Sequence, residues 1–210
     1  MNRLTIGVTS YNKSKYIKDC LESIPDWVDV IIVDDSSTDN TVDIIEQYYD
    51  YNIIKLPINK NVSFCRNLII DKCNTEYLIF LDGDDILMID QIRTIIQTFD
   101  KNIYIFPYYV SYPEQNKFFK YSNIRNDIRN INCILASMIF NVEFIKKNKI
   151  LFDTNLQNLE DFDFILQCLT FDKPNYIKDL YICNYRKFSD GKRLKNSFKI
   201  KTIIRDKYLK

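Results

Sequence analysis

The sequence predicts an α/β protein with a central, mainly parallel sheet flanked by helices. Three observations lead to this prediction. Short apolar runs alternate with segments of helical periodicity through residue 110, which is the rhythm of strand–helix–strand units. The run at residues 28–33 is β-branched apart from Asp29, as in the centre of a parallel sheet. Acidic and polar residues directly follow several runs, where an open parallel sheet binds its ligands.

The first half of the chain supplies most of this pattern. We expect strands at residues 4–8, 28–33, 53–56, 77–81 and 103–110. Helices are expected at residues 12–23 and 63–73, around Val42, Ile45 and Tyr49, and across residues 89–99, where apolar residues recur at helical spacing. Strands that alternate with helices need crossover connections, and these connections favour parallel pairing.

The second half of the chain is less regular. Residues 112–130 are polar, and we expect irregular structure there. An apolar run follows at residues 133–140. We then expect a short helix at 142–148, a longer helix at 159–169 and a strand that returns to the sheet at 176–183. Because neither a linker nor an internal repeat is visible, we expect residues 1–210 to form one domain.

The composition excludes several mechanisms and partners. The 210 residues include no histidine, so proton transfer near neutral pH falls to a carboxylate, Lys, Tyr or Cys. The only glycines are Gly7, Gly83 and Gly191, and their positions exclude glycine-rich dinucleotide motifs and P-loops. A net charge of +1 argues against a nucleic-acid partner.

The cysteines and the N-terminal residues indicate in which cellular compartment the protein is expected. None of the six cysteines forms a C-x-x-C pair, which argues against zinc and favours buried free thiols in a reducing compartment. Residues 1–4 run directly into the first expected strand, so we expect no signal peptide. No apolar run has the length of a membrane span. We therefore expect a cytoplasmic protein with at most peripheral membrane association.

The densest acidic motif is Asp82-Gly83-Asp84-Asp85, which directly follows the apolar run at residues 77–81. Three carboxylates in four residues repel one another unless a cation or protons neutralise them. A divalent metal would do so, and such metals commonly carry nucleotide phosphates; an acidic turn that caps the next helix is the alternative. Polar motifs at 9–12 and 34–39 follow two other strands, and Glu160-Asp161 opens a later helix, so one crevice can receive all of them.

Four motifs in this order resemble the nucleotide-binding half of family 2 glycosyltransferases of GT-A fold. They are Val-Thr-Ser-Tyr-Asn at 8–12, Val-Asp-Asp-Ser-Ser-Thr-Asp at 33–39, Cys-Arg-Asn at 65–67 and Asp-Gly-Asp-Asp at 82–85. The resemblance continues more weakly through 152–153 and 158–161. It implies transfer of a sugar from a nucleoside diphosphate donor, preferentially a UDP-sugar, to an acceptor hydroxyl with inversion at the anomeric carbon.

The resemblance also implies roles for individual residues on the donor side. Thr9 and Tyr11 match residues that pack on the base, and Asp35 matches the aspartate that hydrogen-bonds uracil. Arg66 matches an arginine on the nucleotide side, and Asp82 matches the first aspartate of the D-x-D motif, near the ribose. The alternatives are that Asp35 belongs to a strand–helix loop without a binding role, and that Arg66 forms an ion pair on the surface.

Asp84 and Asp161 carry the chemistry that the resemblance implies. Asp84 matches the ligand of Mn²⁺ or Mg²⁺, which neutralises the departing diphosphate, and Asp161 matches the catalytic base. The alternative for Glu160-Asp161 is simple stabilisation of a helix N-terminus. The aromatic residues Tyr104, Phe106, Tyr108 and Tyr109 either pack in the core, which we favour, or form a sugar-stacking surface.

The chain departs from the family in one respect. Many members carry a histidine near the C-terminal tyrosine–arginine pattern as a further metal ligand, and residues 185–190 resemble that region without one. Asp190 or water would then complete the metal shell, or Lys187 or Lys192 would neutralise phosphate directly. The tail after Lys178 is basic, which fits a solvated helix better than contact with a diphosphate or an anionic membrane.

The resemblance divides the expected domain into two halves. Residues 1–110 form the nucleotide-binding half, and residues 111–210 the acceptor-binding half with the basic tail. The acceptor is a glycan, a protein or a lipid-linked molecule, and oligomerisation is compatible with so short a chain. A nucleotidyltransferase and a catalytically silent nucleotide- or glycan-binding module are the alternative functions. A nucleotidyltransferase should have a phosphate loop rich in glycine and basic residues after the first strand, and residues 9–12 do not provide one. Only the missing histidine favours the silent binding module.

Overall fold

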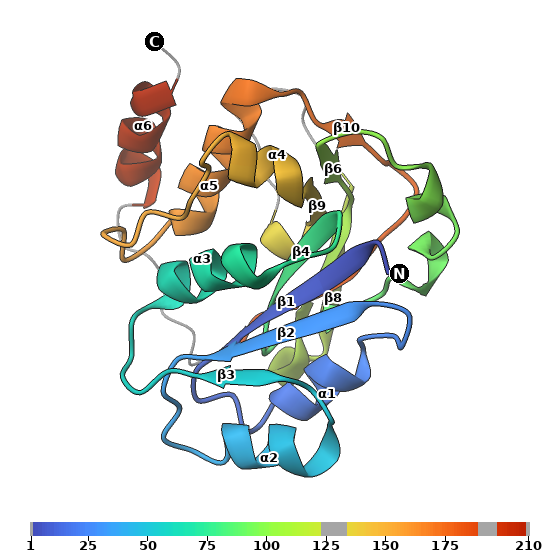
Figure 1. The fold of residues 1–210 in the computed structure, drawn as a ribbon, viewed down its shortest axis with the longest axis vertical. Helices are drawn as coiled ribbons and strands as arrows, with labels where there is room; N and C mark the ends of the chain where they lie inside the picture. Colours follow the sequence, from blue (N-terminus) through green and yellow to red (C-terminus); the bar gives the residue numbers. More distant parts are fainter. Residues whose placement is uncertain (1, 123–133, 189–196, 209–210) are drawn as a thin grey trace.

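The computed structural model describes residues 2–122, 134–188 and 197–208. Its large sheet has seven strands in the order β10–β6–β9–β4–β1–β2–β3 (Figure 1). Their bounds are β1 Leu4–Ser10, β2 Asp29–Asp34, β3 Ile53–Lys55, β4 Tyr77–Asp82, β6 Ile103–Ile105, β9 Met138–Asn141 and β10 Asn175–Tyr176. Neighbours pair in parallel except β9, which is antiparallel to both β4 and β6. The predicted mainly parallel α/β sheet is therefore confirmed.

Helices cover both faces of the large sheet. One core cluster includes α1 Ile17–Glu22, α2 Thr41–Tyr48 and the 3-10 turns η1 Asp90–Ile92 and η2 Ile95–Thr98. The other includes α3 Val62–Lys72, α4 Val142–Lys147 and α5 Glu160–Phe171. Successive side chains of β4 alternate between the two clusters, because neighbours in a strand point to opposite faces. Tyr77 and Ile79 join the first cluster, and Leu78 and Phe80 the second.

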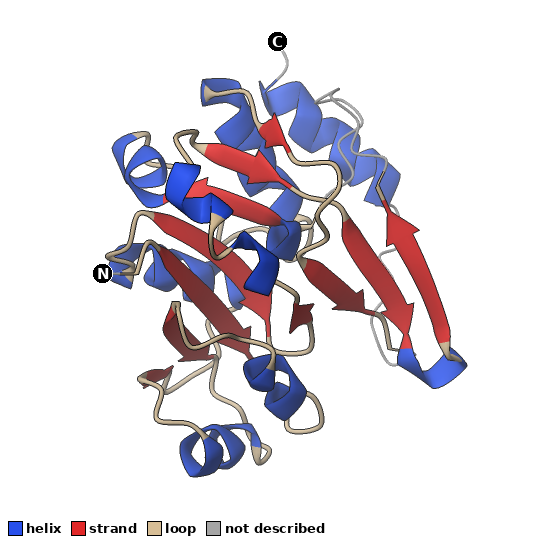
Figure 2. Ribbon diagram, turned by 90° about the vertical axis from the view of Figure 1, so that its right-hand side faces the viewer, coloured by secondary structure: helices blue, strands red, loops and turns tan. Residues whose placement is uncertain are grey.

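A second, four-stranded sheet stands beside the large one (Figure 2). Its strands, in order, are β5 Ile86–Leu87, β11 Cys183–Arg186, β7 Tyr108–Tyr112 and β8 Lys117–Tyr121. Strands β7 and β8 form a hairpin closed by the 3-10 turn η3 Pro113–Gln115. The last helix, α6 Ser197–Tyr208, docks on α5, where Lys207 and Tyr208 bind the fully buried Asp163.

Two of the expected helices are wrong in extent. The helix expected at residues 12–23 begins only at Ile17, because Asn12 has a φ of 53° and its side chain accepts a hydrogen bond from the Thr38 backbone N–H. A residue in this left-handed region cannot continue a right-handed helix. The expected helix across 89–99 is the two short turns η1 and η2.

The strand expected at residues 103–110 is wrong as a single element. It divides at Pro107 into β6 of the large sheet and β7 of the small sheet, since proline lacks the N–H that a ladder requires. Residues 112–130 are not wholly irregular, because they contain β8. The apolar run at 133–140 supplies η5 Leu135–Ser137 and β9, and the segment at 176–183 touches both sheets through β10 and β11. Residues 123–133 lie outside the described residues.

The described part of the chain contains no helix that is both long and apolar enough to cross a bilayer. Its cysteines agree with the expectation of buried thiols, because Cys20, Cys65, Cys73, Cys168 and Cys183 are all buried and free. The sixth cysteine, Cys133, lies outside the described residues.

Gly7 allows β1 and α3 to approach closely. A Cβ atom at this position would lie 2.4 Å from Cγ2 of Ile69 and 3.3 Å from Cδ1 of Leu78. Ile69 is fully buried, and its Cγ2 is fixed directly to a branched Cβ, so it cannot swing away. The glycine therefore sets the spacing between the strand that ends at Thr9 and Ser10 and the helix that carries Arg66.

We predict that Gly7→Ala lowers the free energy of unfolding by about 1–3 kcal/mol, because the added methyl group overpacks the core. Urea denaturation followed by circular dichroism measures the change. In an Ile69→Ala background the clashing methyl group is gone, so the same substitution should cost much less. An equal cost in both backgrounds would show that contact with Ile69 is not the reason for the glycine.

Candidate functional site

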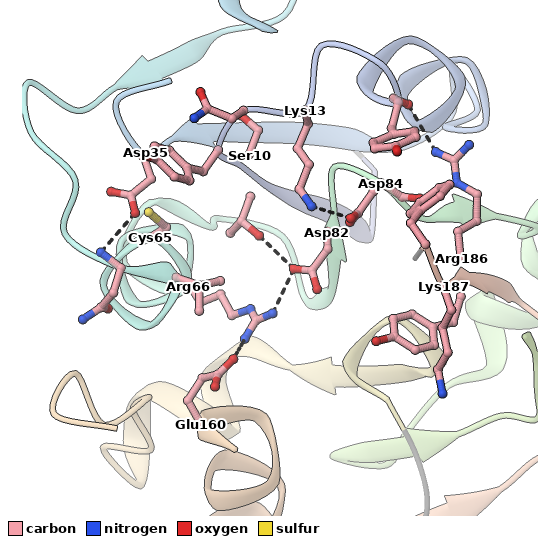
Figure 3. Close-up of a pocket in the computed structure, with 18 of the residues that line it drawn as sticks. Ser10, Lys13, Asp35, Cys65, Arg66, Asp82, Asp84, Glu160, Arg186 and Lys187 are labelled. Atoms are coloured by element: carbon pink, nitrogen blue, oxygen red, sulfur yellow. Dashed lines mark hydrogen bonds and ion pairs between the residues drawn. The ribbon is translucent and has the colours of Figure 1, made fainter. Parts of the chain in front are cut away.

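A cavity of about 1120 Å³ lies at the carboxyl ends of β1 and β4 and extends to the small sheet (Figure 3). The predicted donor-side residues all line it: Thr9, Tyr11, Asp35, Arg66, Asp82 and Asp84. They come from separate strand ends and from α3, so the fold brings distant motifs together as the sequence predicted. Glu160 also lines the cavity, whereas Asp161 is not among its lining residues.

The adjacent carboxylates of Asp34 and Asp35 have different environments. Asp34 is buried and accepts hydrogen bonds from the hydroxyl groups of Ser10 at 2.8 Å and Ser37 at 2.6 Å, so it holds the loop in place. Asp35 faces the cavity and accepts the backbone N–H of Lys60 at 2.7 Å and of Asn61 at 3.0 Å. Asp35 is thus rigidly oriented, with lone pairs left for a ligand.

Arg66 joins two of the predicted motifs. Arg66 is 4% exposed, and its guanidinium donates to Asp82 at 2.8 Å and to Glu160 at 2.9 Å. The same Asp82 oxygen accepts a hydrogen bond from the Thr9 hydroxyl at 3.0 Å, and the guanidinium carbon lies 5.3 Å from the ring centre of Phe152. Arg66 is therefore a buried bridge between the end of β4 and the start of α5, and the surface-pair alternative is wrong.

The network shifts the pKa values of its carboxylates in opposite directions. Burial favours the protonated form of Asp82, but the Arg66 guanidinium and the hydrogen bonds from Arg66 and Thr9 outweigh it and lower the pKa. Burial raises the pKa of Glu160, and the charge of Arg66 offsets only part of that effect, while Asp161 adds to it. Asp82 therefore stays ionised near neutral pH.

Lys13 is a site residue that the sequence analysis missed. Its ammonium contacts the Asp84 carboxylate, which lines the cavity. Burial lowers the pKa of Lys13, but the charges of Asp84, Asp82 and Asp85 outweigh burial and raise it, so the side chain remains a cation. Its position directly after the motif at residues 8–12 was the available signal.

Arg186 is a second site residue that the sequence analysis did not assign. It donates to the Asp84 backbone carbonyl, to the Asp19 carboxylate at 2.9 Å and to the Tyr16 carbonyl at 3.2 Å. Its own backbone N–H binds Asp85 at 2.8 Å. Asp85 is buried, and burial together with its acidic neighbours raises its pKa well above the ordinary range. Asp85 thus ties the acidic loop to β11 and does not face a ligand.

Asp161 lies beside the cavity. Its carboxylate accepts the backbone N–H of Phe162 at 2.7 Å, and its charge acts on Arg66, Glu160 and Tyr185, all of which line the cavity. It is therefore close to the site but is turned toward the first turn of α5.

Asp84 has the chemistry of a ligand for a hard divalent cation. Mg²⁺ usually takes one or two protein carboxylates and completes its shell with phosphate oxygens and water. Within the described ranges no three metal-ligating side chains gather, so donor phosphates and water would supply the remaining oxygens at Asp84. Lys187 lines the same cavity, whereas Asp190 and Lys192 lie outside the described residues.

Comparison with known proteins gives matches along most of the chain. The model of the family described as "Glycosyl transferase family 2" matches residues 5–164. The chain is 32% identical over 190 residues to the teichoic acid poly(glycerol phosphate) polymerase of Staphylococcus epidermidis. This match covers 81% of the chain but only 26% of the polymerase.

Two solved structures resemble the fold. TarS 1–349 of S. aureus in complex with UDP-GlcNAc matches with a TM-score of 0.76 at 21% identity, over 91% of this chain and 60% of the TarS chain. The mannosyltransferase PcManGT from Pyrobaculum calidifontis, in complex with GDP-Man and Mn²⁺, matches with a TM-score of 0.64 at 15% identity. That match covers 99% of this chain and 61% of the mannosyltransferase.

We predict that Arg66→Gln lowers the free energy of unfolding at pH 7 by about 3 kcal/mol, the low end for a buried pair, because it leaves Glu160 and the partly exposed Asp82 without their cation. The difference in the free energy of unfolding between the variant and the wild type should shrink toward pH 4. In the variant the pKa of folded Asp82 rises above its unfolded value, so acid stabilises the fold. The wild-type pKa is lowered, so the wild type loses this contribution only at still lower pH.

Urea denaturation at pH 7 and pH 4 measures this difference. The matched control is Lys55→Gln, which removes an exposed ion pair with Glu46 and should change stability by no more than about 1 kcal/mol. A deficit for Arg66→Gln that stays constant with pH would contradict the assignment of Arg66 as the counterion of Asp82.

Proposed function

The chain belongs to glycosyl transferase family 2 and has the GT-A fold, and from that premise we propose that it transfers a sugar from a UDP-sugar to an acceptor hydroxyl. The observation that carries the proposal is the meeting of Asp35, Asp82 and Asp84 in one cavity. These residues come from the ends of different strands, as a nucleotide-sugar site at the edge of a parallel sheet requires.

The uracil preference rests on Asp35. Its fixed carboxylate accepts two backbone N–H groups and suits a ligand that offers an N–H donor, as the uracil ring does. Thr9 and Tyr11 line the same cavity, and Tyr11 is 46% exposed, which leaves its ring available to pack against a base. The structural relative TarS in complex with UDP-GlcNAc supports the same class of donor.

The diphosphate belongs on the Asp84 side of the cavity. When bound, Mn²⁺ or Mg²⁺ held by Asp84 would neutralise the charge that develops on the departing diphosphate. Lys13 contacts Asp84, and a cation held at Asp84 would compete with that contact. Its ammonium is then free to bind a phosphate oxygen, where it assists the same neutralisation.

The reaction that we propose inverts the anomeric carbon. The acceptor oxygen attacks that carbon from the side opposite the diphosphate, a new C–O bond forms, and the bond from the carbon to the diphosphate oxygen breaks with its electron pair. Asp161 receives the proton of the acceptor hydroxyl, a task that suits a carboxylate in a chain without histidine. Glu160 stays paired with Arg66 and holds the start of α5 in place.

The two halves of the chain divide the task in this proposal. Residues 1–110 bind the donor, and residues 111–210 supply the base and the acceptor-binding surface. A glycan, a protein or a lipid-linked molecule is the acceptor, and an oligomer is compatible with the proposal. The chain spans 26% of the teichoic acid polymerase, so the proposal concerns only the transferase step and not the other activities of that protein.

We predict that calorimetry will detect tighter binding of UDP in the presence of Mn²⁺ than in its absence. Asp84→Asn should remove most of this difference, because a neutral amide holds a divalent cation poorly. The matched control is Asp71→Asn, an exposed residue on α3. Equal affinity with and without Mn²⁺ in the wild type would eliminate the metal from the proposal.

We predict that Asp161→Asn lowers the release of UDP from the preferred donor by about 10²–10⁴-fold, because the base is lost. Binding of UDP should change little. A screen of UDP- and GDP-sugars identifies the donor first, and Asp179→Asn, at an exposed position, is the control. An active Asp161→Asn variant would disprove the base assignment, and wild-type protein that binds UDP but turns over no donor would instead be a silent binding module.

A further inference from the structure

One face of the small sheet continues the cavity away from the donor side. Val110 of β7 pairs with Phe119 of β8 and with Tyr185 of β11, so these three side chains share a face. Tyr112 lies two residues further along β7, and Lys187 directly follows the end of β11, where its backbone N–H binds the Ser111 carbonyl; both return to the same face. We call Tyr112, Phe119, Tyr185 and Lys187 the hairpin face.

The hairpin face is aromatic and open. Tyr112, Tyr185 and Lys187 line the cavity, and the Phe119 ring meets that of Tyr112 edge-on with 6.0 Å between centres. Phe119 is 47% exposed, although it lies at the centre of its strand. Of the four aromatic residues considered from the sequence, Tyr104, Phe106 and Tyr108 are buried in the core as favoured, whereas Tyr109 is half-buried and stacks on Phe118 and Tyr181 on the opposite face of the hairpin. The hairpin face is therefore a continuous platform from the cavity to the surface.

The hairpin face also carries positive charge that the described residues leave available. The Lys187 ammonium lies 5.9 Å from the ring centre of Tyr112 and 5.5 Å from that of Tyr185, and no carboxylate of the described residues pairs with it. Lys117 pairs with Tyr112 across the hairpin and so points to the same face. Glu114, at the hairpin turn, is the carboxylate that lines this end of the cavity.

On the donor side of the cavity, the cations Arg66 and Lys13 already bind carboxylates. They differ in this respect from Lys187 at the other end. Arg66 binds Asp82 and Glu160, and Lys13 binds Asp84. Figure 3 shows the Lys187 side chain extending away from Asp84, on the opposite side of the cavity from Asp35. An anion that Lys187 binds is therefore at a distance from the uracil side of the donor.

We propose that the hairpin face binds the acceptor, and that the acceptor is a sugar or polyol that carries a phosphate group. This inference rests on the proposed glycosyl transfer and names its acceptor class. The apolar C–H face of a sugar or polyol packs on the ring of Phe119 beside Tyr112. The phosphate binds the Lys187 ammonium, a charge-assisted contact that a neutral sugar cannot make.

Saturation-transfer NMR tests the proposal on the intact chain, with UDP and Mg²⁺ present at saturating concentration so that probes cannot enter the donor site. The probes are glucose 6-phosphate and glucose at equal concentration, followed by glycerol 3-phosphate and glycerol to distinguish a sugar from a polyol. The expected result is about fivefold to tenfold tighter binding of each phosphorylated probe than of its neutral counterpart.

Three variants locate the binding. Phe119→Ala should weaken the binding of all probes by about fivefold, because it removes the stacking ring. Phe118→Ala is the matched control, since the neighbouring residue is identical in type but stacks on Tyr109 on the opposite face of the hairpin. Lys187→Gln should abolish the preference for the phosphorylated probe and leave the binding of the neutral probe unchanged.

Several results would overturn the proposal. Equal losses for Phe118→Ala and Phe119→Ala would remove the hairpin face as the binding surface. An unchanged preference for phosphate in Lys187→Gln would remove the anionic acceptor, and weaker binding of UDP in that variant would assign Lys187 to the donor instead. Calorimetry with UDP alone distinguishes these failures from failure of the proposed function, because it reports on the donor site without an acceptor.

Discussion

The contact of buried Arg66 with both Asp82 and Glu160 is the interaction on which the site depends. Two carboxylates that lie 78 residues apart in the sequence, Asp82 and Glu160, repel each other at close range unless a common cation lies between them. Arg66 supplies that cation from the first turns of α3, and Gly7 allows α3 to lie close enough to β1. The end of β4 and the start of α5 are thereby held in one geometry.

The carboxylates of the acidic motif at residues 82–85 each have a different partner. Asp84 has Lys13, Asp82 has Arg66, and Asp85 is buried against the backbone of β11. The three carboxylates that look equivalent in the sequence therefore have three different tasks. Only Asp84 combines an exposed oxygen with a partner that can move, because a lysine ammonium on a flexible stem is readily displaced.

Much of the fold and the donor side could be predicted from the sequence. Continuous apolar runs such as β2 and β4 indicate buried strands regardless of their partners, and polar residues at their ends indicate where ligands gather. The division at Pro107 and the start of α1 at Ile17 depend on backbone conformation and on which sheet the strand joins. Lys13 and Arg186 were missed because a lone cation carries no pattern, and only the folded chain shows which carboxylate or carbonyl it meets.

The small sheet gives the molecule a separable part. Its hairpin, β7 and β8, ends in the turn Pro113–Gln115 and contributes no strand to the seven-stranded sheet that positions Asp35, Asp82 and Asp84. Changes of length or side chain in this hairpin would leave the proposed nucleotide site intact. Under the proposed function, such an architecture would allow the acceptor to change while the activated sugar stays the same, and it would offer engineers a short segment to exchange when they wish to redirect the transfer.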